Sequence, residues 1–301
     1  MRSVAAMTVA VFGAVAGGGA CGERGDDDAD ANRMRVVAAF YPLAWVVSQV
    51  GGDLVRVSDL TPAGGEPHDL ELTPSQVADV VDADLVVAMG AGFQPGVEAA
   101  VSDRAGTSLL VLDALARTGS LGARGAADPH VWLDAERMIA IVDAVASVMS
   151  EVDPDGRAAF ARNAAGVVAE LEDLDHDYVA GLSDCARREL ITAHDAFGWL
   201  AERYDLEPIP IAGISPETEP SAERLGELAS LVAEFGATTI FAETLVSPEI
   251  AETLADEVGG VTVAVLDPIE GRAAADVDAG RDYLDLMRSN LATLRAGLGC
   301  N

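Results

Sequence analysis

Three of the four histidines in this chain lie where an apolar stretch gives way to a loop. His68 stands in the Gly- and Pro-rich segment GGEPHDLE, His130 in DPHVWLD, and His194 directly after LITA. A neutral imidazole nitrogen is a good ligand for zinc and other divalent transition metals, so three together would form most of a tetrahedral site. A single histidine at such a position is more often an ordinary loop residue. The hypothesis therefore depends on whether the fold brings the three together.

Apolar runs that alternate with helical patterns predict the elements that carry these histidines. Eight runs are typical of β-strands: 36–40, 54–60, 85–89, 108–112, 190–193, 208–212, 238–242 and 261–266. Continuous apolar strands separated by helices favour parallel sheets that are covered on both faces. The sequence therefore predicts two similar α/β halves with four strands each.

Several helices have clear signals of their own. Thr73 begins the pattern TPSQ, in which Gln76 completes a capping box, and a helix over 248–258 is ended by a Gly-Gly pair. A longer helix is predicted over 156–182, where apolar residues recur at spacings of three and four. At 1.5 Å per residue this helix would be roughly 40 Å long, enough to run the height of both halves.

The predicted topology places the three histidines at one edge of the sheets. Ligands of open α/β sheets bind beyond the carboxyl ends of the strands, and His68, His130 and His194 follow the second, fourth and fifth predicted strands. Asp267 comes immediately after the last strand, in VAVLDP. Three imidazoles and a carboxylate predict a tetrahedral site for a divalent metal, zinc above all. The fourth histidine, His176 in DLDHDY, falls outside the apolar stripe and is predicted to be exposed.

The segments GGEPHDLELTPSQ, DPHVWLD, TAHDAFGWLAERYDL, FAETLVSPEIAETLADEVG and LDPIEG, in this order, resemble the solute-binding proteins of zinc and manganese ABC importers, the ZnuA/TroA-like family. The resemblance covers residues 35–300. It implies two α/β lobes joined by a rigid backbone helix, here 156–182, with the metal in the cleft between the lobes. The ligands that it implies are His68, His130, His194 and Asp267.

The resemblance also bears on metal choice. The zinc-type branch has histidine at the third ligand position, as this chain does at His194, whereas the manganese-type branch commonly has glutamate. Zinc is therefore the implied cargo and manganese the less favoured one. Glu243, in FAET, matches a glutamate near the family's site and is implied to support a ligand or to be an alternative ligand. Many zinc-type members carry a His/Asp-rich loop before the second ligand, but residues 117–128 contain no histidine.

The N-terminus predicts export. Arg2 precedes thirteen apolar or small residues over 4–16, which matches a secretory signal core and is shorter than the ~20 residues of a membrane-spanning helix. The following GGGAC resembles a bacterial lipoprotein signal, in which Cys21 becomes the lipidated N-terminus. That would anchor the protein to the outer face of the cytoplasmic membrane. Gly18 departs from the aliphatic residue usual in such signals, and an ordinary cleaved signal peptide is the alternative.

These features divide the chain into five predicted segments: a signal peptide at 1–20, an acidic tether at 21–34, an N-terminal lobe at 35–155, a linking helix at 156–182 and a C-terminal lobe at 183–301. Disulfides persist outside the cytoplasm, and two further cysteines are present. Cys185 precedes the first strand of the second lobe and Cys300 follows its last helix. A bridge between them is predicted, with two free thiols as the alternative.

The composition excludes some functions. The 19 basic residues are all arginine, so chemistry that needs a lysine nucleophile or Schiff base is excluded. A net charge of −31 disfavours nucleic acid as a partner, because binding it requires a concentrated basic surface. Half of the residues are hydrophobic, and 301 residues suit two ordinary domains.

The predicted function is capture of Zn²⁺ outside the membrane by a monomeric binding protein that delivers it to an ABC permease. A zinc hydrolase is the first alternative, since hydrolytic zinc keeps an open position for water beside a general base. Glu243 would be that base if Asp267 did not coordinate the metal, although the chain has no HExxH signature. The second alternative is a metal-binding adhesin that uses the metal only structurally.

Overall fold

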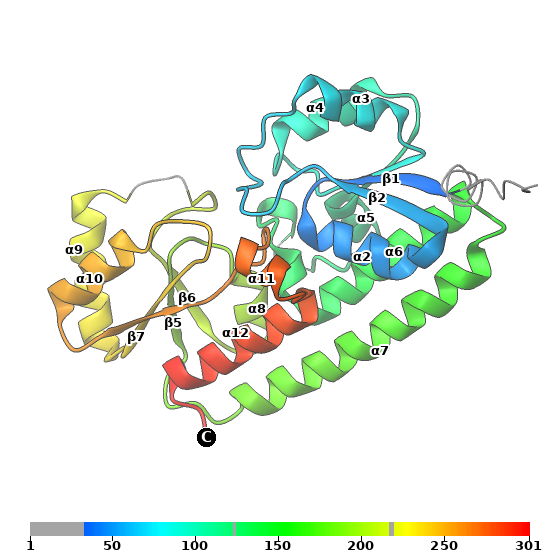
Figure 1. Cartoon of the computed structure of the whole chain (residues 1–301). Coiled ribbons are helices and arrows are strands. Elements are labelled where there is room, and N and C mark those ends of the chain that lie inside the picture. The colour runs from blue at the N-terminus through cyan, green and yellow to red at the C-terminus, as the bar shows by residue number, and fades with distance from the viewer. Residues whose placement is uncertain (1–32, 123–124, 217–219) are drawn as a thin grey trace, which may run out of the picture. The chain divides into compact units, whose positions relative to one another are not determined.

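The computed structural model describes residues 33–122, 125–216 and 220–301 (Figure 1). The predicted signal peptide, the proposed lipidation site Cys21 and nearly all of the acidic tether lie outside the described residues. Residues Arg33–Asn301 form one structural unit. Within the described ranges, no helix combines the length and apolarity needed to cross a membrane.

Two four-stranded parallel sheets form the framework, as the sequence predicts. The first has the order β2-β1-β3-β4 and consists of β1 (Met34–Ala38), β2 (Val55–Asp59), β3 (Leu85–Ala88) and β4 (Thr107–Leu110). The second has the order β6-β5-β7-β8 and consists of β5 (Glu189–Thr192), β6 (Glu207–Pro210), β7 (Thr239–Ala242) and β8 (Thr262–Val265). All eight predicted strands are confirmed, and so is the α/β fold class with two (β/α)4-type lobes.

Helices connect the strands of each sheet. Those of the first half are α2 (Tyr41–Gly51), α3 (Pro74–Asp82), α4 (Pro95–Asp103), α5 (Val111–Thr118) and α6 (Ala135–Val152). Those of the second half are α8 (Gly198–Arg203), α9 (Ala222–Phe235), α10 (Glu249–Val258), α11 (Ala274–Asp278) and α12 (Tyr283–Leu298). Short 3-10 turns occupy Gly52–Leu54, Gly125–Ala127 and Val131–Leu133. The predicted capping box of α3 is present at Thr73, and α10 ends at Gly259 as predicted.

The long helix α7 (Arg157–Leu182) has 26 residues and runs past both sheets (Figure 1). It packs against α2 and α6 of the first half and against α12 of the second. Its buried face carries the apolar residues that the spacing predicts: Phe160, Ala164, Val167, Leu171, Leu174, Tyr178 and Leu182. His176 is exposed, as predicted.

One hydrophobic core extends through both halves. It includes Val87 of the first sheet, Leu171 of α7 and Trp199 of α8. Within β5, Leu190 belongs to this core while Ile191 belongs to a smaller one beneath α9 and α10. Neighbouring residues reach different cores because successive side chains on a strand point to opposite faces. The shared core means that the two halves are packed together and are not joined by a loose hinge.

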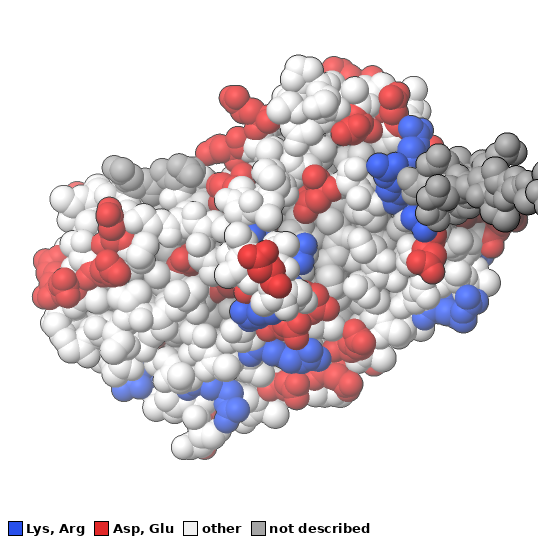
Figure 2. Space-filling view, in the orientation of Figure 1, with Lys and Arg blue, Asp and Glu red and all other residues white. Residues whose placement is uncertain are grey.

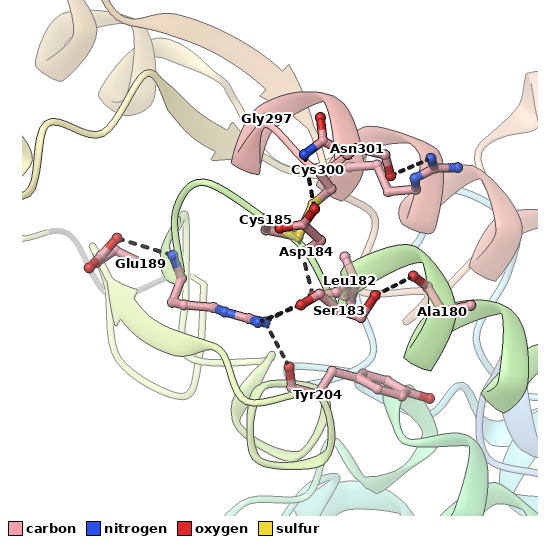
Figure 3. Close-up of a disulfide and its surroundings, with 12 residues drawn as sticks. Ala180, Leu182, Ser183, Asp184, Cys185, Glu189, Tyr204, Gly297, Cys300 and Asn301 are labelled. Atoms are coloured by element: carbon pink, nitrogen blue, oxygen red, sulfur yellow. Dashed lines mark hydrogen bonds between the residues drawn. A yellow bond between two sulfur atoms is a disulfide. The ribbon is translucent and has the colours of Figure 1, made fainter.

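A disulfide links Cys185 to Cys300, as predicted (Figure 3). Backbone hydrogen bonds flank it, since Ala186 N donates to Gly299 O at 3.2 Å and Asn301 N donates to Asp184 O at 3.0 Å. The bridge fixes the segment after α12 to the connection between α7 and β5. It spans 115 residues of sequence and therefore encloses the whole second sheet.

The surface is strongly acidic. Figure 2 shows aspartate and glutamate side chains spread over one face, with arginines gathered mainly near the start of β1 and along the edge that carries α7 and α12. Arginine Arg203, on α8, pairs with Asp175 of α7 at 2.7 Å and with Glu136 of α6 at 2.6 Å. This bridge joins elements of both halves at the surface.

Candidate metal centre

Three histidines and one glutamate converge beyond the carboxyl ends of the strands. The Nε2 atoms of His68, His130 and His194 lie 3.1, 3.1 and 3.2 Å from Oε1 of Glu270. One potential ligand atom from each residue lies within 4.8 Å of all the others. The exposed fractions are 8% for His68, 2% for Glu270 and 0% for the other two. The structure thus brings together the three histidines that the sequence singles out.

The parallel topology explains why residues so distant in sequence meet. His68 follows β2, His130 follows β4, His194 follows β5 and Glu270 follows β8. Parallel strands direct their carboxyl ends to the same edge, so each sheet contributes two of the four side chains. The short turn at Val131–Leu133 comes immediately after His130 and helps to fix its backbone.

Asp267 does not belong to this group, contrary to the prediction. Its Oδ1 accepts hydrogen bonds from Ile269 N at 2.8 Å and from Thr244 Oγ1 at 3.1 Å, and burial raises its pKa to about 6. The side chain closes the turn that it begins. Ile269 has a φ of 55°, in the left-handed region that is costly for a β-branched residue. This turn directs Glu270 toward the histidines.

Glu270 was missed because Asp267 is the acid closest to the strand. The segment LDPIEG contained a usable signal, since an aspartate before proline tends to bond its own backbone two residues on. Applied here, that rule commits Asp267 to the turn. It leaves Glu270 as the remaining acid of the same loop.

In two of the histidines, a single carboxylate oxygen lies within hydrogen-bond distance of both the backbone N–H and the ring Nδ1. His130 donates its backbone N–H to Asp128 Oδ1 at 3.0 Å, and its Nδ1 lies 2.9 Å from the same oxygen. His194 donates its backbone N–H to Glu243 Oε1 at 3.0 Å, and its Nδ1 lies 2.7 Å from that oxygen. A carboxylate on Nδ1 keeps the proton there and leaves Nε2 free to bind a metal. Glu243 therefore lies behind His194, and Asp128 is a supporting residue that the sequence reasoning missed.

His68 is held differently. Its backbone N–H donates to Glu66 Oε1 at 2.8 Å, and its ring lies edge-on to Phe93 with centroids 4.6 Å apart. Burial and the negative charge of Glu270 raise the pKa of Glu66 to about 8. A third acid beside the group is therefore largely protonated at neutral pH, which limits the charge gathered there.

Charge is strongly coupled within the group. Burial by itself would lower the pKa of His194, but hydrogen bonds to Glu243 and Glu270 raise it to about 10. Burial likewise opposes the charged form of His130, and the bonds to Asp128 and Glu270 raise its pKa. Burial favours neutral Glu270, yet hydrogen bonds from the three histidines hold its pKa well below the usual range. The raised pKa values of His130 and His194 favour their protonated forms beside the Glu270 carboxylate.

The arrangement can hold a divalent metal. Three imidazole nitrogens and one carboxylate oxygen match the ligand types and number of a tetrahedral zinc site. Aromatic rings line one side, since the Trp132 ring lies 5.2 Å from His130 and Phe93 lies against His68. Buried apolar walls exclude water and strengthen electrostatic interactions inside.

Comparison with known proteins agrees with this geometry. The profile of the family described as "Zinc-uptake complex component A periplasmic" matches residues 36–297. The zinc-binding protein AdcA of Streptococcus pyogenes serotype M6 is 35% identical over 287 residues, which cover 87% of this chain but only 56% of AdcA. This chain therefore spans about half the length of that relative.

Two other proteins match over most of their length. The high-affinity zinc uptake system protein ZnuA of Bacillus subtilis (strain 168) is 33% identical over 297 residues, 93% of each chain. The structure of the Zn(II)-bound ZnuA-like domain of Streptococcus pneumoniae AdcA superposes with a TM-score of 0.74 at 33% identity, covering 88% of this chain and 99% of that one. With the profile match over nearly the whole described chain, these similarities show that the protein belongs to the ZnuA family of zinc-uptake binding components.

Proposed function

We propose that this protein binds Zn²⁺ outside the cytoplasm and delivers it to an ABC importer. The observation that carries the proposal is the convergence of three histidine Nε2 atoms on one carboxylate oxygen of Glu270, in a buried position between the two sheets. His68, His130, His194 and Glu270 would be the ligands. In this role the metal is cargo, which four protein ligands enclose without an open position for a reacting water.

Zinc is the favoured cargo because of the ligand types. Zinc accepts a tetrahedral site without electronic penalty and binds imidazole well, whereas manganese prefers oxygen ligands and more of them. Three nitrogens and a single carboxylate therefore favour zinc. The names of the matched relatives, a zinc-binding protein and a zinc uptake system protein, support the same choice.

The hydrolase alternative requires Glu243 as its general base, and the position of Glu243 does not favour that role. Glu243 Oε1 is occupied by the backbone N–H and Nδ1 of His194, on the side away from the Nε2 atoms. A general base must reach the attacking water within hydrogen-bond distance, and this carboxylate is engaged elsewhere. We therefore propose a binding protein without enzymatic turnover.

Export, anchoring and partners complete the proposal. The signal core, Cys21 and the disulfide between Cys185 and Cys300 all fit an exported lipoprotein held at the outer face of the cytoplasmic membrane. The permease would be the protein partner, with one copy of this chain acting as a monomer. We keep the division into lobes at 35–155 and 183–301 with the linking helix at 156–182.

Metal analysis with competition titration tests the proposal. The purified protein should bind one zinc per chain, and zinc-loaded protein should pass the metal to vesicles that contain the cognate permease. A chain that binds no zinc would overturn the proposal. An adhesin would bind the metal equally well but would fail the delivery assay, and a hydrolase would turn over ester or peptide substrates.

A further inference from the structure

Two indole N–H groups cross between the halves directly beside the metal centre. Trp132 Nε1 donates to the backbone oxygen of Pro268 at 2.8 Å, and Trp199 Nε1 donates to the backbone oxygen of Asp128 at 2.9 Å. Both tryptophans are fully buried. Each hydrogen bond therefore joins one half of the molecule to a loop of the other half.

The positions of these bonds are reciprocal. Trp132 lies two residues after His130 in the first half, and its acceptor Pro268 lies two residues before Glu270 in the second. Trp199 lies five residues after His194 in the second half, and its acceptor lies two residues before His130 in the first. Each half thus holds the backbone of the loop that carries a metal-binding side chain of the other half.

We propose that Trp132 and Trp199 are positioning residues that couple the arrangement of the two halves to the geometry of the metal centre and so set how long the metal is held. The inference rests on the proposed zinc-binding function. Neither tryptophan is a ligand. They act through His130 and Glu270, which contribute opposite sides of the site.

The Trp132 bond acts on a turn that needs support. Pro268 and Ile269 belong to the turn before Glu270, and the positive φ of Ile269 carries a conformational cost that the surroundings must offset. The indole packs edge-on against the Phe40 ring, with centroids 4.8 Å apart, and the Tyr283 hydroxyl donates to the backbone oxygen of Trp132 at 2.5 Å, which holds the backbone of the same residue. A fixed donor therefore holds the carbonyl of a strained turn.

The Trp199 bond acts on the residue that orients His130. The Asp128 backbone oxygen accepts from Trp199, while its side chain holds the backbone N–H and Nδ1 of His130. The guanidinium of Arg137 lies 4.1 Å above the Trp199 ring. Arg137 also pairs with Asp134 and, at 3.6 Å, with Glu202. A shift of α8 would therefore move Asp128 and turn the His130 ring.

The third tryptophan provides a matched control. Trp45 is also buried, and its ring lies 4.8 Å from that of Tyr283, but its Nε1 has no hydrogen-bond partner in the described structure. Trp45→Phe removes an indole N–H that bonds to nothing. Trp132→Phe and Trp199→Phe remove the same group and with it a hydrogen bond to a backbone carbonyl of the other half. All three changes delete a similar amount of buried ring.

The test is the rate of zinc release from each purified variant into excess chelator, with thermal unfolding of the metal-free protein measured in parallel. We expect Trp132→Phe and Trp199→Phe to release zinc about three- to tenfold faster than Trp45→Phe, the range expected for loss of one buried hydrogen bond. Trp132→Phe and Trp199→Phe should also lower the unfolding temperature more than Trp45→Phe, because only they break a buried hydrogen bond. Equal release rates in the three variants would overturn the inference and leave the tryptophans with a purely structural role.

A second variant tests the inference if Trp132→Phe or Trp199→Phe fails to fold. Biosynthetic replacement of tryptophan by benzothienylalanine in the Trp45→Phe protein substitutes sulfur for the N–H at only Trp132 and Trp199 and keeps the ring shape. Faster zinc release supports the inference, and an unchanged rate overturns it. Zinc binding by the parent is measured first. A parent that binds no zinc would refute the proposed function. If the parent binds zinc, unchanged release rates in the variants would refute only the inference about the tryptophans.

Discussion

His130 and His194 belong to different halves and follow different strands, β4 and β5, and the carboxylates that support them come from different places in the chain. Each gives its backbone N–H and Nδ1 to a single carboxylate oxygen. For His130 that carboxylate is Asp128, two residues earlier in the same loop. For His194 it is Glu243, 49 residues away beyond β7. The first support is built by one loop, whereas the second requires that β5 and β7 lie correctly side by side.

The same carboxylate–histidine pair therefore depends on local sequence at His130 and on the tertiary structure of the second sheet at His194. Loss of the Asp128 carboxylate should therefore act mainly on the metal centre, because the bonds that it makes to His130 stay within one loop. Changes near His194 should affect the metal centre and the packing of the second sheet together.

Removal of either histidine should have the largest effect. His130→Ala and His194→Ala each delete a ligand nitrogen, so zinc affinity should fall by more than the ~10–100-fold that loss of a supporting partner costs. Competition titration with a chelator of known affinity measures this. His176→Ala, on the exposed face of α7, is the control and should bind zinc like the parent. Parent-like affinity in either of the first two variants would show that the histidine is not a ligand.

The pH dependence should be the next largest effect. Hydrogen bonds to Glu243 and Glu270 outweigh burial and raise the pKa of His194 to about 10, so zinc must displace a proton at neutral pH. Affinity should therefore rise with pH up to about 10, by about tenfold per unit for each proton displaced. Calorimetry in buffers of different ionisation enthalpy counts the protons released. Glu243→Gln should lower that count near pH 8, and an unchanged count would contradict the role of Glu243.

The same titration has a consequence for the metal-free protein. A pKa raised from 6.5 to about 10 means that the charged His194 stabilises the folded state fully below about pH 6.5. This stabilisation is lost as the pH rises toward 10. The unfolding temperature of the metal-free parent should therefore fall over that interval more than that of Glu243→Gln.

Substitution of Asp128 and of Glu243 compares the local support of His130 with the distant support of His194. Asp128→Asn and Glu243→Gln should each weaken zinc binding about 10–100-fold, because both orient a ligand. We expect only Glu243→Gln to lower the unfolding temperature of the metal-free protein clearly, since it alone joins two strands of a sheet. Titration and thermal unfolding of both variants test this. Equal destabilisation would remove the distinction between local and distant support.

A change of ligand type at His194 should have a moderate effect on metal choice. His194→Glu replaces nitrogen by oxygen, so zinc should be weakened while manganese loses less or gains. The ratio of the two affinities should narrow about tenfold or more, measured by paired titrations. Equal losses for both metals would indicate that His194 supports the fold and does not set selectivity.

The disulfide should have the smallest effect on the metal centre. Cys185 precedes the amino end of β5, beside Cys300 (Figure 3), whereas the ligands follow the carboxyl ends of the strands. A Cys185→Ser, Cys300→Ser double variant should lose about 2–5 kcal/mol of stability, the usual cost of removing a native bridge. Its zinc affinity should stay close to that of the parent. A large loss of affinity would mean that the bridge holds β5, and with it His194, in place.

Much of the fold and part of the centre could be predicted from sequence. The spacing of apolar residues predicts the strands and the buried face of α7. The carboxyl end of a parallel strand is a known position for ligand-binding residues. The choice between Asp267 and Glu270 depends on how one turn folds, which strand position alone does not determine. The role of Asp128 could not be predicted, because it depends on the side-chain rotamer of His130. The Trp199 bond depends on how α8 packs against the first half, and the Trp132 bond depends on where the loop after β8 lies; neither is encoded locally.

The four side chains at the centre come from widely separated parts of the chain. Glu270 lies 202, 140 and 76 residues after its three histidine partners. No shorter stretch of the chain holds the complete set, so the four-residue site is assembled only when both sheets have formed. Metal that binds only the assembled site stabilises finished molecules and offers little to partly folded ones. If the protein carries zinc as proposed, only completely folded molecules would take up the metal, and folding intermediates would stay empty.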